Sequence, residues 1–171
     1  DHDELFYLMM YNEALPMPSR PELPDLEKGV IRGGYCLESA VGEGPRINLL
    51  GSGTILFEVI EAASRLRQEG FAVAVYSITS YIELARDAEQ AENSKAASWL
   101  SQLFDEPHVP TVAASDYVRT LPRMIASWVP GPLVALGTDG FGMSERREAL
   151  RAHFRVDAYA IAETARSLVK A

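Results

Sequence analysis

Short apolar runs alternate with amphipathic stretches along most of the chain. The first run, 5–11 (LFYLMMY), predicts a buried strand, and 29–38 (GVIRGGYCLE) predicts a second one. Gly33 and Gly34 would weaken that second strand or bend it into a bulge. The segment between the two runs, 12–25, contains four prolines, which remove backbone donors and disfavour helix. We therefore expect an extended connector there.

From Arg46 onward, predicted strands and helices alternate. Four apolar runs predict strands at 47–50, 71–78, 111–114 and 132–136. Helical spacing of apolar residues predicts helices at 54–69, 80–88, 96–104, 116–129, 144–154 and 157–168. This alternation predicts an α/β fold: a three-layer α/β/α sandwich with a mostly parallel, mixed sheet of about five strands, four of them parallel. One of the strands before Arg46 should be antiparallel or lie off the main sheet.

The expected helices carry signals for their faces and their ends. In 54–69, one apolar face consists of Leu56, Val59, Ile60, Ala63 and Leu66. Gly70 should stop that helix, and Pro122 is expected to kink the helix at 116–129. Ser144 should cap 144–154, with Glu148 near a capping-box position. Asp157 should cap the last helix, whose inward residues are Ile161, Ala165 and Leu168.

The length of 171 residues suits one domain, 1–171, in which 1–45 holds the N-terminal strands and proline-rich connector and 46–171 the alternating core. A formal net charge of -8 argues against a nucleic-acid partner. The single cysteine, Cys36, excludes an intrachain disulfide and a cysteine-based zinc site, and fits a cytoplasmic location. No apolar run has the length of a membrane span, and the acidic N-terminus is unlike a signal peptide.

A weak anion-site candidate lies between the strand at 47–50 and the helix that follows it. Its residues are Gly51, Ser52, Gly53 and Thr54. Backbone amides at the start of a helix bind anions. A dinucleotide fingerprint, however, requires a third glycine at the position of Leu56. A tight turn that needs small residues explains the segment without a ligand, and we favour this interpretation.

A second candidate, an interface or ligand loop, follows the strand at 132–136. Its residues are Thr138, Asp139, Gly140, Phe141, Gly142, Ser144 and Arg147. The carboxyl ends of parallel strands are where α/β sheets bind ligands. The loop also has a structural interpretation, in which Asp139 bonds local amides and Phe141 folds back as a plug. We favour the shaped loop over a ligand site, and we expect that Phe141 anchors a protein contact rather than forming a plug, because aromatic residues commonly do so.

No catalytic constellation is recognisable. The three histidines are His2, His108 and His153, and none has a second histidine or a carboxylate at metal-ligand spacing. A Gly-x-Ser-x-Gly nucleophile motif is also missing. The residues alone therefore predict no catalytic, cofactor-binding or metal-binding group.

Several sequence blocks, in order, resemble the last third of homodimeric, thiamine-diphosphate-dependent pyruvate dehydrogenase E1 components. These blocks are LFYLMMYNEALPMP, EKGVIRGGYCL, INLLGSGTILFEVIEAA, VYSITSYIELARDAE, ASDYVRTLPRMIASWVP and LGTDGFGMSERREALRAHFRVDA. The run 136–157 is the most specific. Where the family usually shows Asp-Thr-Arg-Glu, this chain has Glu145-Arg146-Arg147-Glu148, and 90–106 is divergent. These departures leave open the choice between pyruvate and a related 2-oxo acid.

The resemblance implies a transketolase C-terminal-like domain. In such enzymes two upstream domains bind thiamine diphosphate and Mg²⁺ across a homodimer interface. The whole enzyme decarboxylates pyruvate and reductively acetylates the lipoyl group of the E2 dihydrolipoyl acetyltransferase. The diphosphate-binding Gly-Asp-Gly…Asn-Asn stretch is absent here. We therefore expect a domain that holds no cofactor, packs against the upstream domains and the second subunit, and is inactive in isolation.

A free-standing α/β binding or regulatory module for a small anion is the alternative. The genomic sequence upstream of Asp1 discriminates between the two. An open reading frame that continues into thiamine-binding motifs identifies a fragment, and a start codon just before Asp1 identifies a module.

Overall fold

The computed structural model describes residues 14–15, 19–104 and 106–170, so the strand predicted for 5–11 lies outside the described residues. Its helices are α1 Leu26–Ile31, α2 Ile55–Gln68, α3 Tyr81–Ser94, α4 Trp99–Leu103, α5 Thr120–Arg123, α6 Arg147–His153 and α7 Ala158–Lys170. Its strands are β1 Gly34–Glu38, β2 Arg46–Ser52, β3 Ala72–Ile78, β4 Thr111–Ala114 and β5 Leu133–Leu136.

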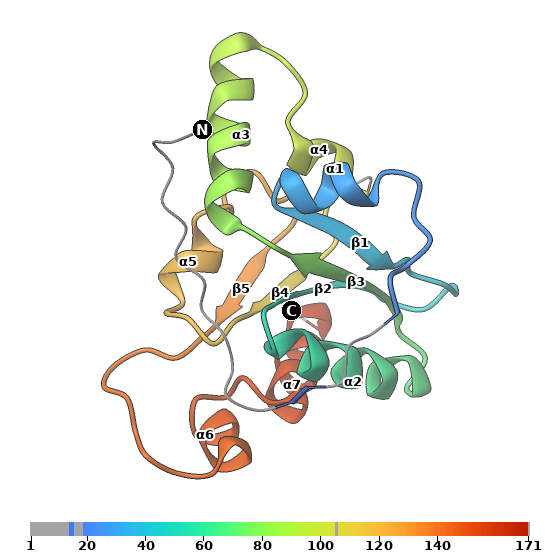
Figure 1. The fold of residues 1–171 in the computed structure, drawn as a ribbon. Helices are drawn as coiled ribbons and strands as arrows, with labels where there is room; N and C mark the ends of the chain where they lie inside the picture. Colours follow the sequence, from blue (N-terminus) through green and yellow to red (C-terminus); the bar gives the residue numbers. More distant parts are fainter. Residues whose placement is uncertain (1–13, 16–18, 105, 171) are drawn as a thin grey trace.

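The five strands form one mixed sheet in the order β1-β3-β2-β4-β5. β1 is antiparallel to β3, and the pairings β2–β3, β2–β4 and β4–β5 are parallel. Parallel neighbours need crossover connections, which here contain α2 between β2 and β3, and α3 and α4 between β3 and β4. α2 lies on one face of the sheet together with α7, which follows the last strand, and α3 and α4 lie on the other face (Figure 1). The predicted α/β fold, with four parallel strands and one antiparallel strand before Arg46, is confirmed.

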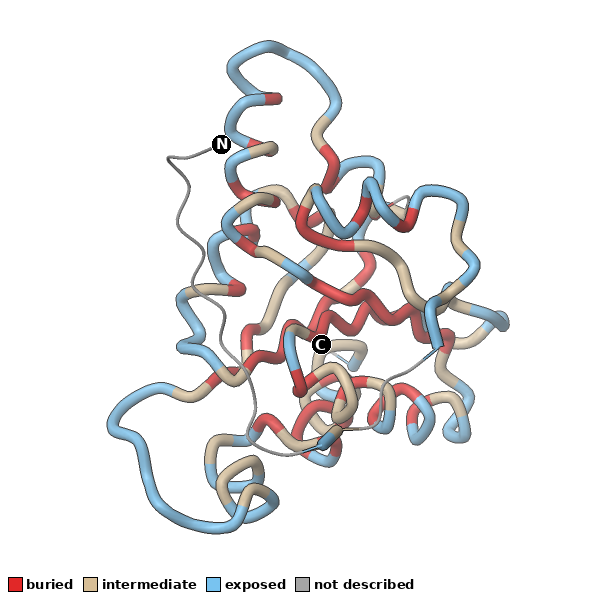
Figure 2. Tube along the Cα trace, viewed as in Figure 1, coloured by how far each residue is buried: buried red, intermediate tan, exposed pale blue. Residues whose placement is uncertain are grey.

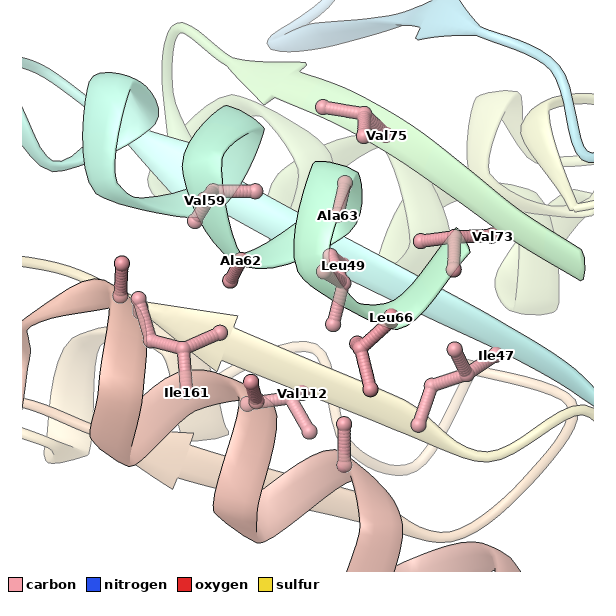
Figure 3. Close-up of a cluster of buried hydrophobic side chains, with 14 of the residues drawn as sticks. Ile47, Leu49, Val59, Ala62, Ala63, Leu66, Val73, Val75, Val112 and Ile161 are labelled. Atoms are coloured by element: carbon pink, nitrogen blue, oxygen red, sulfur yellow. The ribbon is translucent and has the colours of Figure 1, made fainter. Parts of the chain in front are cut away.

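The layer between the sheet and helices α2 and α7 is closely packed (Figure 3). Its buried residues are Ile47, Leu49, Ile55, Val59, Ala62, Ala63, Leu66, Val73, Val75, Val112, Ala114, Val156, Ala158, Ile161, Ala162 and Ala165. Strand residues in this layer alternate along β2, because successive side chains point to opposite faces of a sheet. Alanines on α2 and α7 let the two helices approach each other closely.

The opposite layer is richer in aromatic residues. Its buried residues are Leu50, Ala74, Tyr76, Ile78, Tyr81, Leu84, Ala85, Ala88, Trp99, Leu100, Phe104, Ala113, Ile125 and Val129. The Trp99 indole N–H donates to the Gly34 carbonyl at 2.9 Å, which fastens α4 to β1. Figure 2 shows that the central strands carry the most continuous burial, and so the core lies on both faces of one sheet.

Several predicted helix ends agree with the structure. Gly70, with φ of 89°, follows the C-cap of α2, as its permissive backbone predicts. The Asp157 carboxylate accepts from the backbone N–H of Ala160 at 3.0 Å, so Asp157 caps α7. Ser80 caps α3 in the same way, through the N–H of Glu83.

The strand predicted at 29–38 is wrong in its first half, where α1 forms instead. Gly33, with φ of 100°, ends the helix region and turns the chain into β1. The Gly33 carbonyl accepts the backbone N–H groups of Thr79 and Ser80, and a Cβ on Gly33 would lie 2.4 Å from the Ser80 oxygen. The prediction failed because it took Ile31 as part of a buried apolar run. Ile31 is 76% exposed, so its side chain does not indicate a buried strand.

The helix predicted at 116–129 is also wrong, since only α5 and the turns after it are present. Backbone groups that a helix would use are already engaged by the loop after β5. The Tyr117 carbonyl accepts the Thr138 N–H at 2.9 Å, and the Asp116 carbonyl accepts the Thr138 hydroxyl at 2.5 Å. Pro122 therefore sits within a single turn rather than kinking a long helix.

The start of α6 differs from the prediction as well. The helix begins at Arg147 with Arg146 as its N-cap residue, and no side chain caps it. Ser144 lies in the exposed loop before it and does not form the expected capping box. No helix in the described part of the chain has the length and apolarity needed to cross a membrane.

Candidate functional site

The carboxyl ends of β2, β4 and β5 are tied together by small polar side chains. The Ser52 hydroxyl donates to the Ser115 hydroxyl at 2.8 Å. Ser115 is fully buried, and its hydroxyl also accepts the N–H of Tyr117 at 3.2 Å. Together with the hydrogen bond from Thr138 to Asp116, these contacts make the strand edge a rigid base for the loops above it.

The loop at 138–146 projects from this base and is largely exposed (Figure 2). Asp139 anchors its first part: one carboxylate oxygen accepts the backbone N–H of Arg119 at 2.8 Å, and the other accepts the Arg119 Nε at 2.6 Å. The N–H bond from Arg119, followed by its guanidinium, lowers the pKa of Asp139 below its ordinary value. Gly140 takes a φ of 92°, which turns the chain away from the body.

Phe141, at the tip of the loop, is 95% exposed, and Met143 is 54% exposed. An aromatic ring in this position buries almost none of its apolar surface. The plug interpretation, in which Phe141 folds back under its own loop, is therefore contradicted by the exposure of the ring.

A pocket of about 340 Å³ separates this loop from the start of α2 and from α6. Residues that line it are Thr54, Ile55, Asp116, Thr138, Gly140, Phe141, Gly142, Met143, Arg147, Leu150, Arg151, Phe154 and Val156. The fold thus brings the two candidate segments, 51–54 and 138–147, to one edge of the sheet. Asp139 and Ser144 are outside the lining, because Asp139 turns toward Arg119 and Ser144 stays on the exposed loop.

Glu58, in the first turn of α2, ties the surrounding helices together. Its Oε1 accepts from Arg151 of α6 at 2.7 Å, and its Oε2 accepts the backbone N–H of Ala158, the first residue of α7, at 2.8 Å. Arg151 also reaches the Thr54 hydroxyl at 3.3 Å. Neither Glu58 nor Arg151 was a candidate from the sequence. An acidic residue early in a helix favours capping-type bonds, but it does not reveal which other helices it binds.

The glycines of the segment 51–54 are explained by packing. Gly51 lies within β2, and a Cβ there would lie 2.8 Å from the Cα of Leu56. Gly53 has φ of 56° and forms the turn, with the Asp116 carboxylate 3.7 Å from the position of a Cβ. Asp116 and Glu58 place carboxylates near the start of α2, and Arg147 and Arg151 place guanidinium groups there. The tight-turn interpretation accounts for the segment without a ligand.

The described histidines lie elsewhere. His108 has a positive φ of 65° and bonds through its N–H to the Pro130 carbonyl, and His153 packs edge-on against Phe154 in α6. Across residues 14–15, 19–104 and 106–170, no group of three His, Cys, Asp or Glu side chains is placed to hold a metal ion.

Comparison with known proteins assigns the family. A family model described as "Transketolase-like TK C-terminal domain" matches residues 33–157. The chain is 39% identical over 163 residues, 90% of its length, to the pyruvate dehydrogenase E1 component of Escherichia coli K12. It is 36% identical over 163 residues to that of Mycobacterium tuberculosis. The chain spans 18% and 17% of the length of these two relatives.

Solved structures agree on the fold. Transketolase from Leishmania mexicana superimposes with a TM-score of 0.60 at 21% identity, over 84% of this chain and 19% of the transketolase chain. A split-gene transketolase matches with a TM-score of 0.53 at 19% identity, over 80% of this chain and 42% of the other. The sheet order, the helices on both faces and the match over 33–157 lead to one conclusion: this chain belongs to the transketolase-like C-terminal domain family.

Proposed function

We propose that this chain is the C-terminal domain of a pyruvate dehydrogenase E1 enzyme. The whole enzyme would decarboxylate pyruvate and reductively acetylate the lipoyl group of the E2 acetyltransferase in the cytoplasm. The observation that carries the proposal is the 39% identity to an E1 component over 90% of the chain. The alternative, a free-standing anion-binding module, is not favoured, because the glycines before α2 serve the turn and the packing.

The residues of this domain do not fit the cofactor of such an enzyme. Thiamine diphosphate with Mg²⁺ needs carboxylate and carbonyl ligands around the metal. The described side chains offer no cluster of that kind, and the sequence has no Gly-Asp-Gly…Asn-Asn stretch. We assign cofactor binding and chemistry to upstream domains of the longer protein, and to this domain a role in assembly.

The loop at 138–146 is the surface we assign to that assembly. It presents Phe141 and Met143 to solvent at the carboxyl edge of the sheet, beside a pocket lined by Leu150 and Phe154 of α6. Aromatic residues that are exposed in one subunit and buried in an assembly commonly dominate interface energies. In the full enzyme the partner would be an upstream domain or the second subunit of a homodimer.

Calorimetry tests whether this domain binds the cofactor. Thiamine diphosphate and Mg²⁺ titrated into the 171-residue chain should produce no saturable heat, and pyruvate should not be turned over. A full-length E1 component titrated in parallel is the positive control. Micromolar binding to the 171-residue chain would overturn the proposal. The reading frame upstream of Asp1 is a second test, since a start codon immediately before Asp1 would favour the free-standing module.

A further inference from the structure

A second pocket lies far from the loop at 138–146, on the sheet face that α3 and α4 cover. It has a volume of about 320 Å³ and opens at the amino end of β2, between β1, β3 and the segment after α4. The candidate site above occupies the carboxyl end of the same strands. The two pockets therefore serve different ends of the sheet.

Asn48 of β2 is the unusual residue of this second pocket. It lies in the middle of a buried strand and is 7% exposed. Its backbone N–H donates to the Pro110 carbonyl, whereas its side-chain amide makes no hydrogen bond with any described residue. The amide is not among the buried polar atoms that lack a partner in the described residues, so it faces the pocket, where water or a ligand can bind it. The pocket is about ten times the volume that one water occupies, and it falls within the range of ligand sites.

The other groups of the pocket restrict the ligand. Among the described residues, the charged ones that line it are Arg46 and Glu106, which form an ion pair with each other at 2.5 Å. The pocket therefore has no net charge with which to hold a phosphate or a carboxylate. The rings of Tyr76 and Phe104, 4.8 Å apart between centroids and tilted by 50° to each other, supply aromatic surface on which a flat ring can pack. A neutral, planar molecule fits these surroundings.

An asparagine amide presents a donor beside an acceptor, and it pairs with two atoms of a base edge such as that of adenine. We infer that this pocket binds a neutral nucleobase-type heterocycle, with Asn48 reading its donor–acceptor edge and the rings of Tyr76 and Phe104 packing against it. This site is independent of the assembly role proposed above. Its failure would leave that proposal unchanged.

Adenine is the probe for the experiment. Titrated into the ¹⁵N-labelled 171-residue chain, it should shift the side-chain NH₂ signal of Asn48 saturably, with a Kd of about 1 mM or tighter. Purine, which lacks the exocyclic amino group, should bind at least about tenfold more weakly, because the Asn48 acceptor loses its partner. Adenosine 5′-phosphate should bind no more tightly than adenosine, because Arg46, the cation among the described lining residues, is already paired with Glu106.

Two variants complete the test. Asn48→Leu should weaken adenine binding at least about tenfold, because it removes both hydrogen bonds while keeping the branched shape of the side chain. Ser39→Trp places a large side chain on an exposed rim residue and should abolish binding without lowering the melting temperature. If Asn48→Leu does not fold, adenine binding to Ser39→Trp tests the inference. Unchanged adenine binding in a folded variant, shifts outside the pocket, or no saturation at millimolar adenine would overturn the inference.

Discussion

Helices α6 and α7 follow each other in sequence, yet they are held in place in different ways. α7 buries Ile161 and Ala165 completely against α2 and the sheet, whereas α6 buries no residue. α6 has seven residues, which is too short for stability without tertiary contacts, and Arg151 ties it to the body through Glu58 and Thr54. The loop that precedes it exposes Phe141 and Met143.

The comparison separates two uses of apolar residues. In the layer below the sheet, apolar side chains are already covered and contribute to the stability of the domain itself. In the loop at 138–146, Phe141 and Met143 remain exposed, so their burial is available only to a partner. A domain of a larger enzyme should contain both kinds of region. The following substitutions are chosen to separate them.

The largest effect is expected for Leu66→Ala in α2. Leu66 is fully buried between the sheet and α7, so the truncation leaves a cavity and should lower the free energy of unfolding by about 3 kcal/mol. Met143→Ala in the exposed loop is the control and should change it by less than about 0.5 kcal/mol. Chemical denaturation of both variants measures the difference. Equal losses would mean that the loop is part of the folded core.

Glu58→Ala should have the next largest effect, since Glu58 joins the two regions. Its loss leaves Arg151 and the N–H of Ala158 without their partner, which should cost about 2 kcal/mol of unfolding free energy. Glu61→Ala, which removes only the exposed pair with Arg65 on the same helix, should cost about 0.5 kcal/mol or less. Hydrogen exchange in α6 should accelerate in the first variant alone. Unaltered exchange would show that Glu58 does not tether α6.

Phe141→Ala should leave the isolated domain unchanged and weaken the assembled enzyme. The ring is 95% exposed, so the melting temperature of the 171-residue chain should not fall. In the full enzyme, docking or dimerisation should weaken by about 2 kcal/mol, about a thirtyfold change in Kd measured by ultracentrifugation. Val41→Ala, 82% exposed on the opposite part of the chain, is the control and should alter neither quantity. A lower melting temperature without a change in assembly would contradict the proposed interface role of Phe141.

The smallest effect concerns Asp139. Its pKa is lowered by the N–H and guanidinium of Arg119, so it stabilises the folded state above its ordinary pKa of 3.8, and this contribution is lost as pH falls through the lower folded-state pKa. Because the pair is exposed, Asp139→Asn should barely change stability near neutral pH. Melting curves across the acidic range should show a slightly shallower decline for the variant. A steeper decline would mean that the sign of the shift is wrong.

The apolar runs determined most of the fold from sequence. β3, β4 and β5 form close to where continuous runs of Val, Ala, Leu and Ile predict buried strands. The spacing of Val59, Ala63 and Leu66 predicts the buried face of α2, and Asp157 predicts the start of α7. These features depend on local periodicity and capping, which neighbouring residues specify. The parallel pairing of the strands follows from the long connections between them.

Tertiary structure decided what depends on residues distant in sequence. The carbonyls of Gly33, Asp116 and Tyr117 take partners from other loops, and these bonds replace the strand and the long helix that local pattern predicts. Thr54 meets residues of the loop at 138–146 in one pocket, and the amide of Asn48 faces the other pocket, only when the sheet assembles. The sequence pattern shows which residues are apolar. The packing of the whole domain decides which backbone groups form hydrogen bonds with each other.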